Sequence, residues 1–264
     1  MDVVRPEFVP DPSLSREEME RLQGEIAAAA AFEDDLGFDP ADVGAGGEAP
    51  TADQTTLGEA DSEPLVVGVD QAFRDDQAVS AVVVLRGDTV VERAHAVEPA
   101  AIPYVPGLLS FREGNAVISA LEALESDPDL LLVDGSGRIH FREAGLATHV
   151  GVTLDIPAVG VAKSLLCGRP RESLADPLPE GQRVAIEADG DVTAPDGRVI
   201  GYAVQTRQFD SDSRHVNPLY VSPGHRVSGE TAAGLVLACA AGYKLPEPTR
   251  LADAYADEVK HTGR

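Results

Sequence analysis

The sequence predicts an α/β fold in which a mixed sheet is flanked by helices. Three valine-rich runs separated by short turns predict an antiparallel meander over residues 65–96. Beyond the meander, segments with apolar residues at helical spacing alternate with short apolar runs, a pattern typical of strands and helices in alternation. The chain has 264 residues, 43% of them hydrophobic, which is enough for one domain with a substantial core.

The first predicted element is a helix in the N-terminal region, residues 1–32. Ser15 and Glu18 have the spacing of a capping box, in which each side chain bonds the other residue's backbone N–H. Met19, Leu22 and Ile26 follow at helical spacing, so we expect an amphipathic helix that ends near Phe32.

The next segment, residues 33–63, differs in composition from the rest of the chain. It contains ten acidic residues, no basic residue and frequent glycine. Such a segment buries little apolar surface, so it is expected to be a flexible acidic insertion, although a functional acidic tail is an alternative. The compact domain is then expected to span residues 64–264.

The compact domain is predicted to begin with the three strands of the meander, residues 65–69, 78–85 and 90–96. The turn at residues 86–89 contains an Arg-Gly-Asp-Thr sequence that favours a tight hairpin. The later elements follow in order: a helix around 116–124, a buried strand at 130–133, a helix around 144–154, a buried strand at 158–162, a hairpin at 183–187 and 198–206, a strand at 219–221 and a buried helix from 228 to about 241.

The charge of the chain conflicts at first with a nucleic-acid partner. The formal net charge is −24, and phosphate binding normally requires a basic surface. Of the 21 basic residues only three are lysines, which leaves 18 arginines against 45 acids. An acid-rich, lysine-poor balance resembles proteins adapted to a very salty cytoplasm, where repulsion is screened over a few ångströms. We therefore interpret the charge as an adaptation to solvent.

Several protein classes are not favoured by this sequence. No run approaches the about 18 consecutive apolar residues of a membrane span, and the N-terminus lacks the pattern of a signal peptide. Cys167 and Cys239 lack the spacing of a disulfide framework or a structural zinc site. The sequence therefore predicts a cytoplasmic protein without a membrane partner.

Two carboxylates follow buried strands and are the first candidates for chemistry. Asp70 and Asp134 each end an apolar run, and neighbouring strands would direct both into one crevice. Carboxylates held close repel each other, and a divalent cation compensates that repulsion. Together with Glu113, near the start of a helix, they match a magnesium-dependent phosphoryl-transfer site. The alternative is that each acid only caps a turn or helix.

Three basic or titratable residues are further candidates, and Lys163 carries the most weight among them. Lys163 follows a buried strand in a chain that nearly lacks lysine, which favours a charge aimed at a phosphate over an ordinary exposed lysine. His225 lies between a strand and a helix, where it could ligate a metal, position water or bond a turn. His140 carries a weaker signal, and a core or surface role is equally compatible with its position.

A proline-stiffened loop with an aromatic residue precedes the helix that carries Glu113. The loop, Tyr104–Gly107, could insert into a base stack in place of an extruded base, although an ordinary loop is the alternative. Gly135 and Gly145 would allow close backbone approach beside the same crevice, as a base pocket requires.

Four segments carry a likeness to a known family: residues 104–113, 133–137, 160–164 and 221–226. Together they resemble endonuclease V, the deoxyinosine-specific nuclease, and the resemblance extends from about residue 64 to 254. It implies a ribonuclease H-like fold and a Mg²⁺ cofactor, with Mn²⁺ as a substitute. It also implies that the enzyme nicks DNA at the second phosphodiester bond 3′ to deoxyinosine, leaving 3′-hydroxyl and 5′-phosphate ends.

The resemblance assigns roles residue by residue. Asp70, Glu113 and Asp134 match the metal-binding acids, and His225 matches a fourth catalytic residue. Lys163 and His140 match active-site residues near the scissile strand. Tyr104 matches the wedge, and the residues that would enclose hypoxanthine are Gly107, Leu109, Gly135, Gly145, Leu146 and Leu166.

Two departures from the family pattern and three other functions remain to be weighed. Ser136 stands where a histidine is common between two glycines, which could weaken contacts beside the metal, and the acidic insertion is long. The nearest alternative is an endoribonuclease acting on inosine in RNA. A junction resolvase should lack the wedge and form an obligate dimer, and a non-catalytic nucleic-acid-binding protein should have lost an acid. We expect a monomer.

Overall fold

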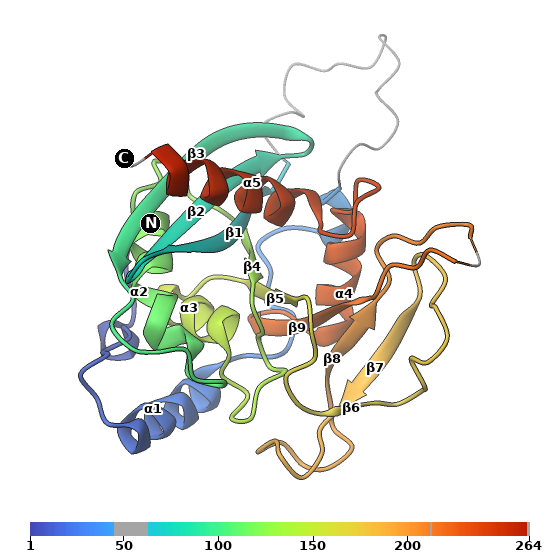
Figure 1. Ribbon diagram of the computed structural model, residues 1–264, viewed down its shortest axis with the longest axis horizontal. Helices are drawn as coiled ribbons and strands as arrows, with labels where there is room; N and C mark the ends of the chain where they lie inside the picture. The colour runs from blue at the N-terminus through green and yellow to red at the C-terminus, as the bar shows by residue number, and fades with distance from the viewer. Residues whose placement is uncertain (45–62, 212, 263–264) are drawn as a thin grey trace.

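One large sheet organises the molecule. The computed structural model describes residues 1–44, 63–211 and 213–262, and within them nine strands form a single sheet in the order β3-β2-β1-β4-β5-β9-β8-β7-β6 (Figure 1). The strands are β1 (Leu65–Arg74), β2 (Gln77–Arg86), β3 (Thr89–Pro99), β4 (Leu130–Asp134), β5 (Ala158–Ala162), β6 (Arg169–Pro170), β7 (Arg183–Glu187), β8 (Val199–Val204) and β9 (Leu219–His225).

The strand directions confirm the predicted mixed sheet. β1, β2 and β3 form the antiparallel meander, β4 and β5 run parallel to β1, and β9 returns antiparallel beside β5. The first five strands in this order give the ribonuclease H-like arrangement that the resemblance implied. β2 is buried on both faces, whereas β3 alternates between exposed and half-buried residues because it forms an edge of the sheet.

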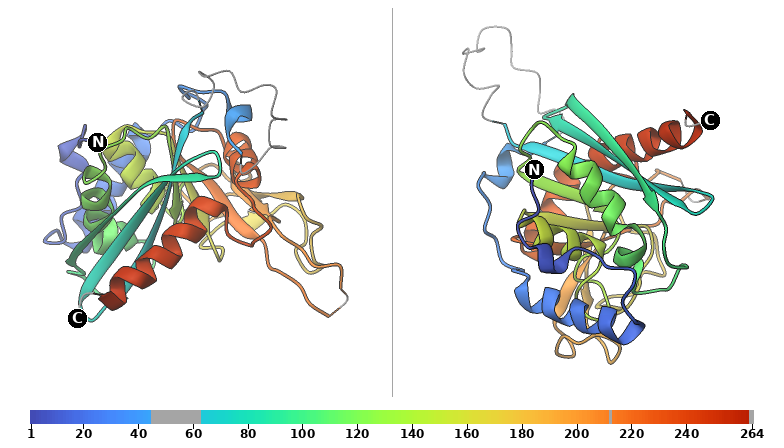
Figure 2. Two further views of the ribbon diagram at one scale, coloured as in Figure 1. Left: turned by 90° about the horizontal axis from the view of Figure 1, so that it is seen from above. Right: turned by 90° about the vertical axis from the view of Figure 1, so that its left-hand side faces the viewer.

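Helices cover both faces of this sheet. α2 (Leu109–Glu122) and α3 (Leu146–Leu154) pack on one face, and α4 (Gly229–Ala238) and α5 (Glu247–Thr262) pack on the other (Figure 2). The two faces bury separate apolar clusters, one around Val117 and Leu121 of α2 and one around Leu235 of α4. None of the helices in the described part of the chain is long and apolar enough to span a membrane.

The N-terminal segment packs against the side of α3. α1 (Arg16–Ala29) has the predicted capping box, because the Ser15 hydroxyl accepts the Glu18 N–H and the Glu18 carboxylate accepts the Ser15 N–H. A short 3₁₀ helix (Pro6–Phe8) precedes it. The backbone N–H groups of Val4 and Arg5 donate to the Thr153 carbonyl at 3.1 and 3.0 Å, which attaches this segment to the end of α3.

The prediction that residues 33–63 are a flexible insertion is wrong for residues 33–44. The Asp34 carboxylate accepts hydrogen bonds from the Ser228 N–H and hydroxyl, and it thereby caps α4. Val43, just after a second 3₁₀ helix (Pro40–Asp42), is buried against the α4 cluster. Composition alone missed these contacts because a few fixed polar bonds order an acidic segment. The rest of the predicted insertion, residues 45–62, lies outside the described residues.

Helix α5 was not predicted, although its sequence carries a helical signal. Leu251, Tyr255 and Ala252 pack against the meander, and Ala256 continues the buried stripe at helical spacing. The start of α5 presses on β1 at Gly68, where an added Cβ would lie 1.9 Å from the Pro248 carbonyl oxygen. The helix therefore lies directly on the strand that carries Asp70.

Helix α3 contains a fully buried histidine that should make stability depend on pH. The Nε2–H of His149 donates to the Phe8 carbonyl at 2.6 Å, and burial lowers the pKa of His149 to about 4. The unfolded chain, with a pKa near 6.5, therefore binds a proton first as the pH falls, and folding stability decreases between about pH 6.5 and 4.

We expect His149 to contribute about 3 kcal/mol of this acid-induced loss, since one pKa unit corresponds to about 1.4 kcal/mol. Urea unfolding of wild type and His149→Gln at pH 7 and pH 4.5 measures the difference. His215→Gln, at an exposed position, is the matched control. An equal loss of stability in wild type and His149→Gln would contradict the prediction.

Candidate active site

The structure brings Asp70 and Asp134 together. β1 and β4 are parallel neighbours with Val69 opposite Val133, so the following acids lie side by side. Both strands are buried apolar runs up to this point, which leaves the acids as the first polar side chains along each strand.

This proximity changes the protonation of the pair. Burial raises the pKa of Asp70 to about 9, and the hydrogen bond with Asp134 and its negative charge act in the same direction. Without a cation beside it, the buried Asp70 carboxyl group therefore keeps its proton at neutral pH. Two carboxyl groups this close are typical of a site that binds a cation.

Lys163 supplies positive charge from the end of the neighbouring strand. It follows β5, and its Nζ lies 2.7 Å from Asp134 Oδ2. Burial lowers the pKa of Lys163, but the carboxylates of Asp134, Asp70 and Asp253 outweigh that effect and raise it. The lysine is charged, half-exposed and within reach of a phosphate placed at the acids.

Asp253 is a further acid of this cluster that the sequence analysis missed. It lies on α5 with its Oδ1 3.7 Å from Lys163 Nζ, and its charge contributes to the raised pKa of Asp70. The available signal was the helical spacing of residues 251–256, which would have directed one face of this helix to the meander.

Glu113 lies within α2, and not before the helix as its sequence position suggested. It is 4% exposed, and burial raises its pKa to about 7. The adjacent Arg112 opposes this rise, whereas the charge of Asp134 adds to it. Glu113, an acid from the helical layer, therefore interacts electrostatically with Asp134 of the strand pair.

The donor chemistry of this cluster fits a hard divalent cation. Among the described residues, no three His, Cys, Asp or Glu side chains converge into a ready-made metal cage. Mg²⁺ does not require one, since it binds through one or two carboxylates and completes its shell with water and substrate phosphates. The adjacent Asp70 and Asp134 carboxyl groups, the first of them buried and raised in pKa, form the arrangement that such a cation would stabilise.

The predicted catalytic role of His225 is wrong. β9 runs antiparallel to β5, so His225 lies opposite Ala158 at the start of β5, whereas Asp134 lies beside Val161 near its end. Its Nδ1 accepts the Ala31 N–H at 3.2 Å, and its Nε2 donates to Asp155 at 3.0 Å. The histidine fixes a turn at the opposite end of the sheet, which was the structural alternative.

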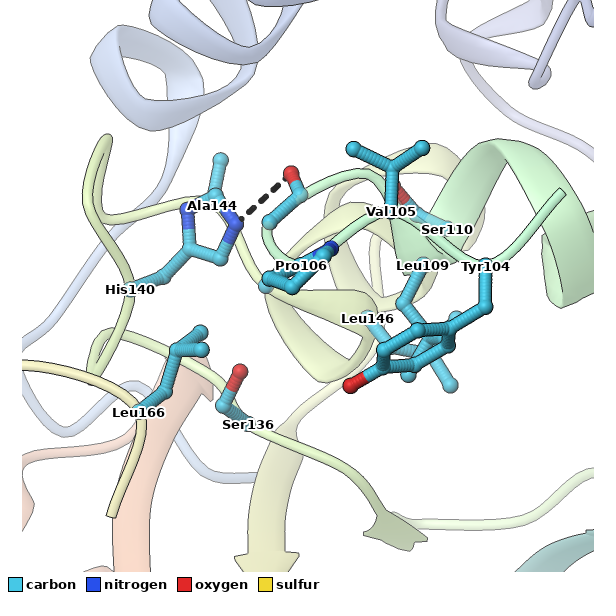
Figure 3. Close-up of a pocket in the computed structure, with 12 residues that line it drawn as sticks. Tyr104, Val105, Pro106, Leu109, Ser110, Ser136, His140, Ala144, Leu146 and Leu166 are labelled. Atoms are coloured by element: carbon cyan, nitrogen blue, oxygen red, sulfur yellow. Dashed lines mark hydrogen bonds between the residues drawn. The ribbon is translucent and has the colours of Figure 1, made fainter.

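A pocket lies beside the acid cluster, under the loop Tyr104–Gly107, which we call the wedge loop. The pocket has a volume of about 370 Å³ including its open mouth, and the Tyr104 side chain, 67% exposed, stands at its rim (Figure 3). Six residues that were predicted to contact the substrate line it: Tyr104, Gly107, Leu109, Gly145, Leu146 and Leu166. Ser136 lines it as well. Gly135 lies behind this wall, with its backbone against Leu146.

The structure gives His140 a structural role at this pocket. Its Nδ1 accepts the Arg142 N–H at 3.2 Å, so the proton is on Nε2, which donates to the Gly107 carbonyl at 3.0 Å. Burial lowers the pKa of His140 to about 4, so the ring is neutral. Both ring nitrogens are therefore engaged with backbone groups, and His140 lines the pocket while it holds the wedge loop.

Close backbone packing joins the pocket to the acid cluster. An added Cβ at Gly160 would lie 2.2 Å from the Gly137 nitrogen, because β5 runs directly beneath the loop that follows Asp134. The same loop places Ser136 in the pocket wall, so the serine that replaces the usual histidine faces the pocket. Asp134 and Ser136 are two residues apart in the chain.

Comparisons with known proteins agree with this arrangement. The sequence profile of the family Endonuclease V matches residues 51–254. Endonuclease V of Haloarcula marismortui is 65% identical over 98% of this chain and 97% of its own length. The crystal structure of endonuclease V from Streptomyces avermitilis is 32% identical, with a TM-score of 0.73 over 98% of this chain and 97% of that chain.

A more distant solved structure has the same fold. Ciona intestinalis endonuclease V, in complex with a 24mer DNA containing an inosine followed by a ribo-adenosine, is 23% identical. Its TM-score is 0.68, over 94% of this chain and 98% of that chain. The family profile covers most of this chain, and the Haloarcula protein matches nearly all of it. This chain therefore belongs to the endonuclease V family.

Proposed function

We propose that this protein nicks DNA at the second phosphodiester bond 3′ to deoxyinosine and leaves 3′-hydroxyl and 5′-phosphate ends. The observation that carries the proposal is that the ends of two neighbouring strands each supply a charged residue of the acid cluster and a residue of the pocket wall. β4 ends in Asp134 and is followed by Ser136, and β5 is followed by Lys163 and then Leu166. Two or three residues span at most about 7–11 Å, so the pocket lies within that distance of the acid cluster. An extruded base can then occupy the pocket while a nearby phosphodiester lies at the acids.

The acids of the cluster would hold Mg²⁺, with Mn²⁺ as a substitute. Asp70 and Asp134 are the inner pair, and Glu113 and Asp253 contribute from the two helical layers. The cation, when bound, would activate water and offset the charge of the phosphate. Lys163 would then donate a hydrogen bond from Nζ to a phosphate oxygen, because its present partner, Asp134, would be engaged with the cation.

The pocket is suited to an extruded purine base. Its wall is mostly apolar, from Leu109, Leu146 and Leu166, and backbone groups approach closely at Gly145. The Ser110 hydroxyl also lines it, is buried, and has no hydrogen-bond partner among the described residues. A base edge could satisfy this hydroxyl. Inosine is the base we propose, since the Ciona relative was solved with DNA that contains it.

Replacing Tyr104 by alanine should reduce discrimination for inosine more than it reduces cleavage chemistry. The side chain is exposed at the pocket rim, where it can stack on the unpaired strand, and such stacking contributes about 1–3 kcal/mol per base. We expect the ratio of nicking rates for inosine and adenine strands to fall about tenfold or more. Tyr243→Ala, at an exposed tyrosine outside the pocket, is the control. An unchanged ratio would show that the base is selected by other groups.

The proposed function is tested by comparing DNA and RNA strands that contain a single inosine, with matched adenine strands as controls. Nicking should require Mg²⁺ or Mn²⁺ and should favour inosine in DNA, and end-labelled products should map the cut to the second bond on the 3′ side. Faster cleavage of the RNA strand would indicate an inosine-specific endoribonuclease instead. Binding without cleavage under all metal conditions would indicate a non-catalytic nucleic-acid-binding protein.

A further inference from the structure

Helix α1 contacts the wedge loop through one buried amide. Gln23 is fully buried, and its Nε2 donates to the Gly107 carbonyl at 2.7 Å. Its Oε1 accepts a hydrogen bond from the Arg142 guanidinium at 3.3 Å. A carbonyl can only accept and a guanidinium can only donate, so these two partners fix the orientation of the amide.

The same carbonyl accepts a second buried hydrogen bond. His140 Nε2 donates to the Gly107 oxygen at 3.0 Å, so both lone pairs of this oxygen have partners. Arg142 connects the two donors, because its backbone N–H bonds His140 and its side chain bonds Gln23 and Glu20. The Gly107 carbonyl is therefore held from two sides by a closed polar network.

Through Gly107, this network can fix the position of the wedge loop over the pocket. It has a φ of +82°, and an added Cβ would lie 2.9 Å from the Phe141 ring, so its backbone fits tightly against that ring. Tyr104 precedes it by three residues, and Leu109 begins α2 two residues later. The exposed Tyr104 side chain gains little from packing, so its position depends on the loop backbone that Gly107 anchors.

We propose that Gln23 is a positioning residue for inosine discrimination, acting through the Gly107 carbonyl to hold the wedge loop over the pocket. The inference rests on the proposed function and extends the recognition site to the N-terminal helix. The family profile begins its match at residue 51, so the matched region does not include Gln23. Gln23 touches neither the acids nor the proposed substrate.

The first test follows the loop itself and does not depend on cleavage. The chain contains no tryptophan, so Tyr104→Trp places a single fluorescent reporter at the rim of the pocket. In that background, Gln23→Met keeps the side-chain length but removes both hydrogen bonds. We expect lower fluorescence anisotropy and stronger acrylamide quenching than in Tyr104→Trp alone. Arg21→Met, at an exposed position of the same helix, is the matched control and should change neither value.

The second test measures discrimination in the chain with Tyr104 intact. Gln23→Glu keeps the shape and the acceptor for Arg142 but, when ionised, cannot donate to Gly107. We expect Gln23→Met and Gln23→Glu each to lower the inosine-to-adenine ratio of kcat/KM about tenfold, the effect of one lost buried hydrogen bond. Most of the change should be in KM for the inosine strand, and kcat should change less. Arg21→Met should keep the wild-type ratio.

Each outcome separates this inference from the proposed function. A wild-type enzyme without preference for inosine would overturn the proposed function before any variant is compared. A wild-type preference that both Gln23 variants retain would overturn the positioning role. At a pH at which the introduced glutamate is ionised, loss in Gln23→Met with a normal Gln23→Glu would also overturn it, because packing and not donation would then matter. Circular dichroism monitors folding, and if Gln23→Met does not fold, the isosteric Gln23→Glu decides the question.

Discussion

Replacement of Asp134 by asparagine is expected to lower nicking of inosine-containing DNA by about 10³-fold or more, the effect of removing a group that stabilises transition-state charge. The amide has the size of the carboxyl group, so the strand end should keep its shape. The change removes the negative charge that pairs with Lys163 at 2.7 Å and that interacts with Asp70 and Glu113. A cation would then lose an anionic oxygen ligand and keep at most the weaker amide oxygen.

Binding should respond differently from cleavage. Removing a carboxylate from a site that receives phosphate reduces repulsion, so affinity for the inosine strand should be equal or higher. Steady-state nicking in Mg²⁺ and fluorescence anisotropy of a labelled strand measure the two properties separately. Asp88→Asn, in the exposed β2–β3 turn, is the matched control. Cleavage by Asp134→Asn at a wild-type rate would remove Asp134 from the proposed metal site.

Replacement of Gly160 by alanine is expected to lower the free energy of unfolding by about 3 kcal/mol, at the upper end of overpacking effects. The new Cβ would lie 2.2 Å from the Gly137 nitrogen and 2.6 Å from the Ser136 carbonyl carbon, both backbone atoms. Side-chain rotation cannot relieve such contacts, so the loop after Asp134 must shift. We expect Tm to fall by about 6–12 °C for a chain of this size.

The same shift should impair function, because this loop forms part of the pocket wall. Thermal unfolding by circular dichroism and the nicking rate at a temperature where both proteins are folded measure the two effects. Gly190→Ala is the control, since an added Cβ there has nothing within 4 Å. Equal Tm values for wild type and Gly160→Ala would show that the β5 contact is looser than the structure indicates.

The charged residues at the ends of the buried apolar runs were predictable from the sequence because strand periodicity is local, although β1 continues past Asp70 to Arg74. The buried runs that end in Asp70 and Asp134, and the one followed by Lys163, are visible without knowledge of the fold. That these strands are adjacent depends on long-range pairing, which the alternation of elements only suggested. The four segments that resemble endonuclease V then narrowed the candidate pocket residues to a few.

The errors have physical causes as well. His225 follows a glycine in a motif near a strand, and only the direction of that strand shows that it lies far from the acids. Asp253 was missed because α5 was missed, and α5 is a polar helix whose apolar stripe is narrow. Residues 33–44 were assigned as flexible from composition, whereas single contacts such as Asp34 with Ser228 decide their order.

The two ends of the sheet differ in how they can meet a neighbouring molecule. β6 has two residues and includes Pro170, whereas β3 has eleven residues and leaves Val91 and Val97 exposed. A long edge strand is a template for strand addition, and charged side chains usually prevent this. At about 1 M salt the Debye length is only about 3 Å, so charges protect such an edge poorly. In concentrated brine, resistance to aggregation would then depend on features that salt does not screen, such as Pro99 at the end of β3 and the irregularity in its pairing beside Val84.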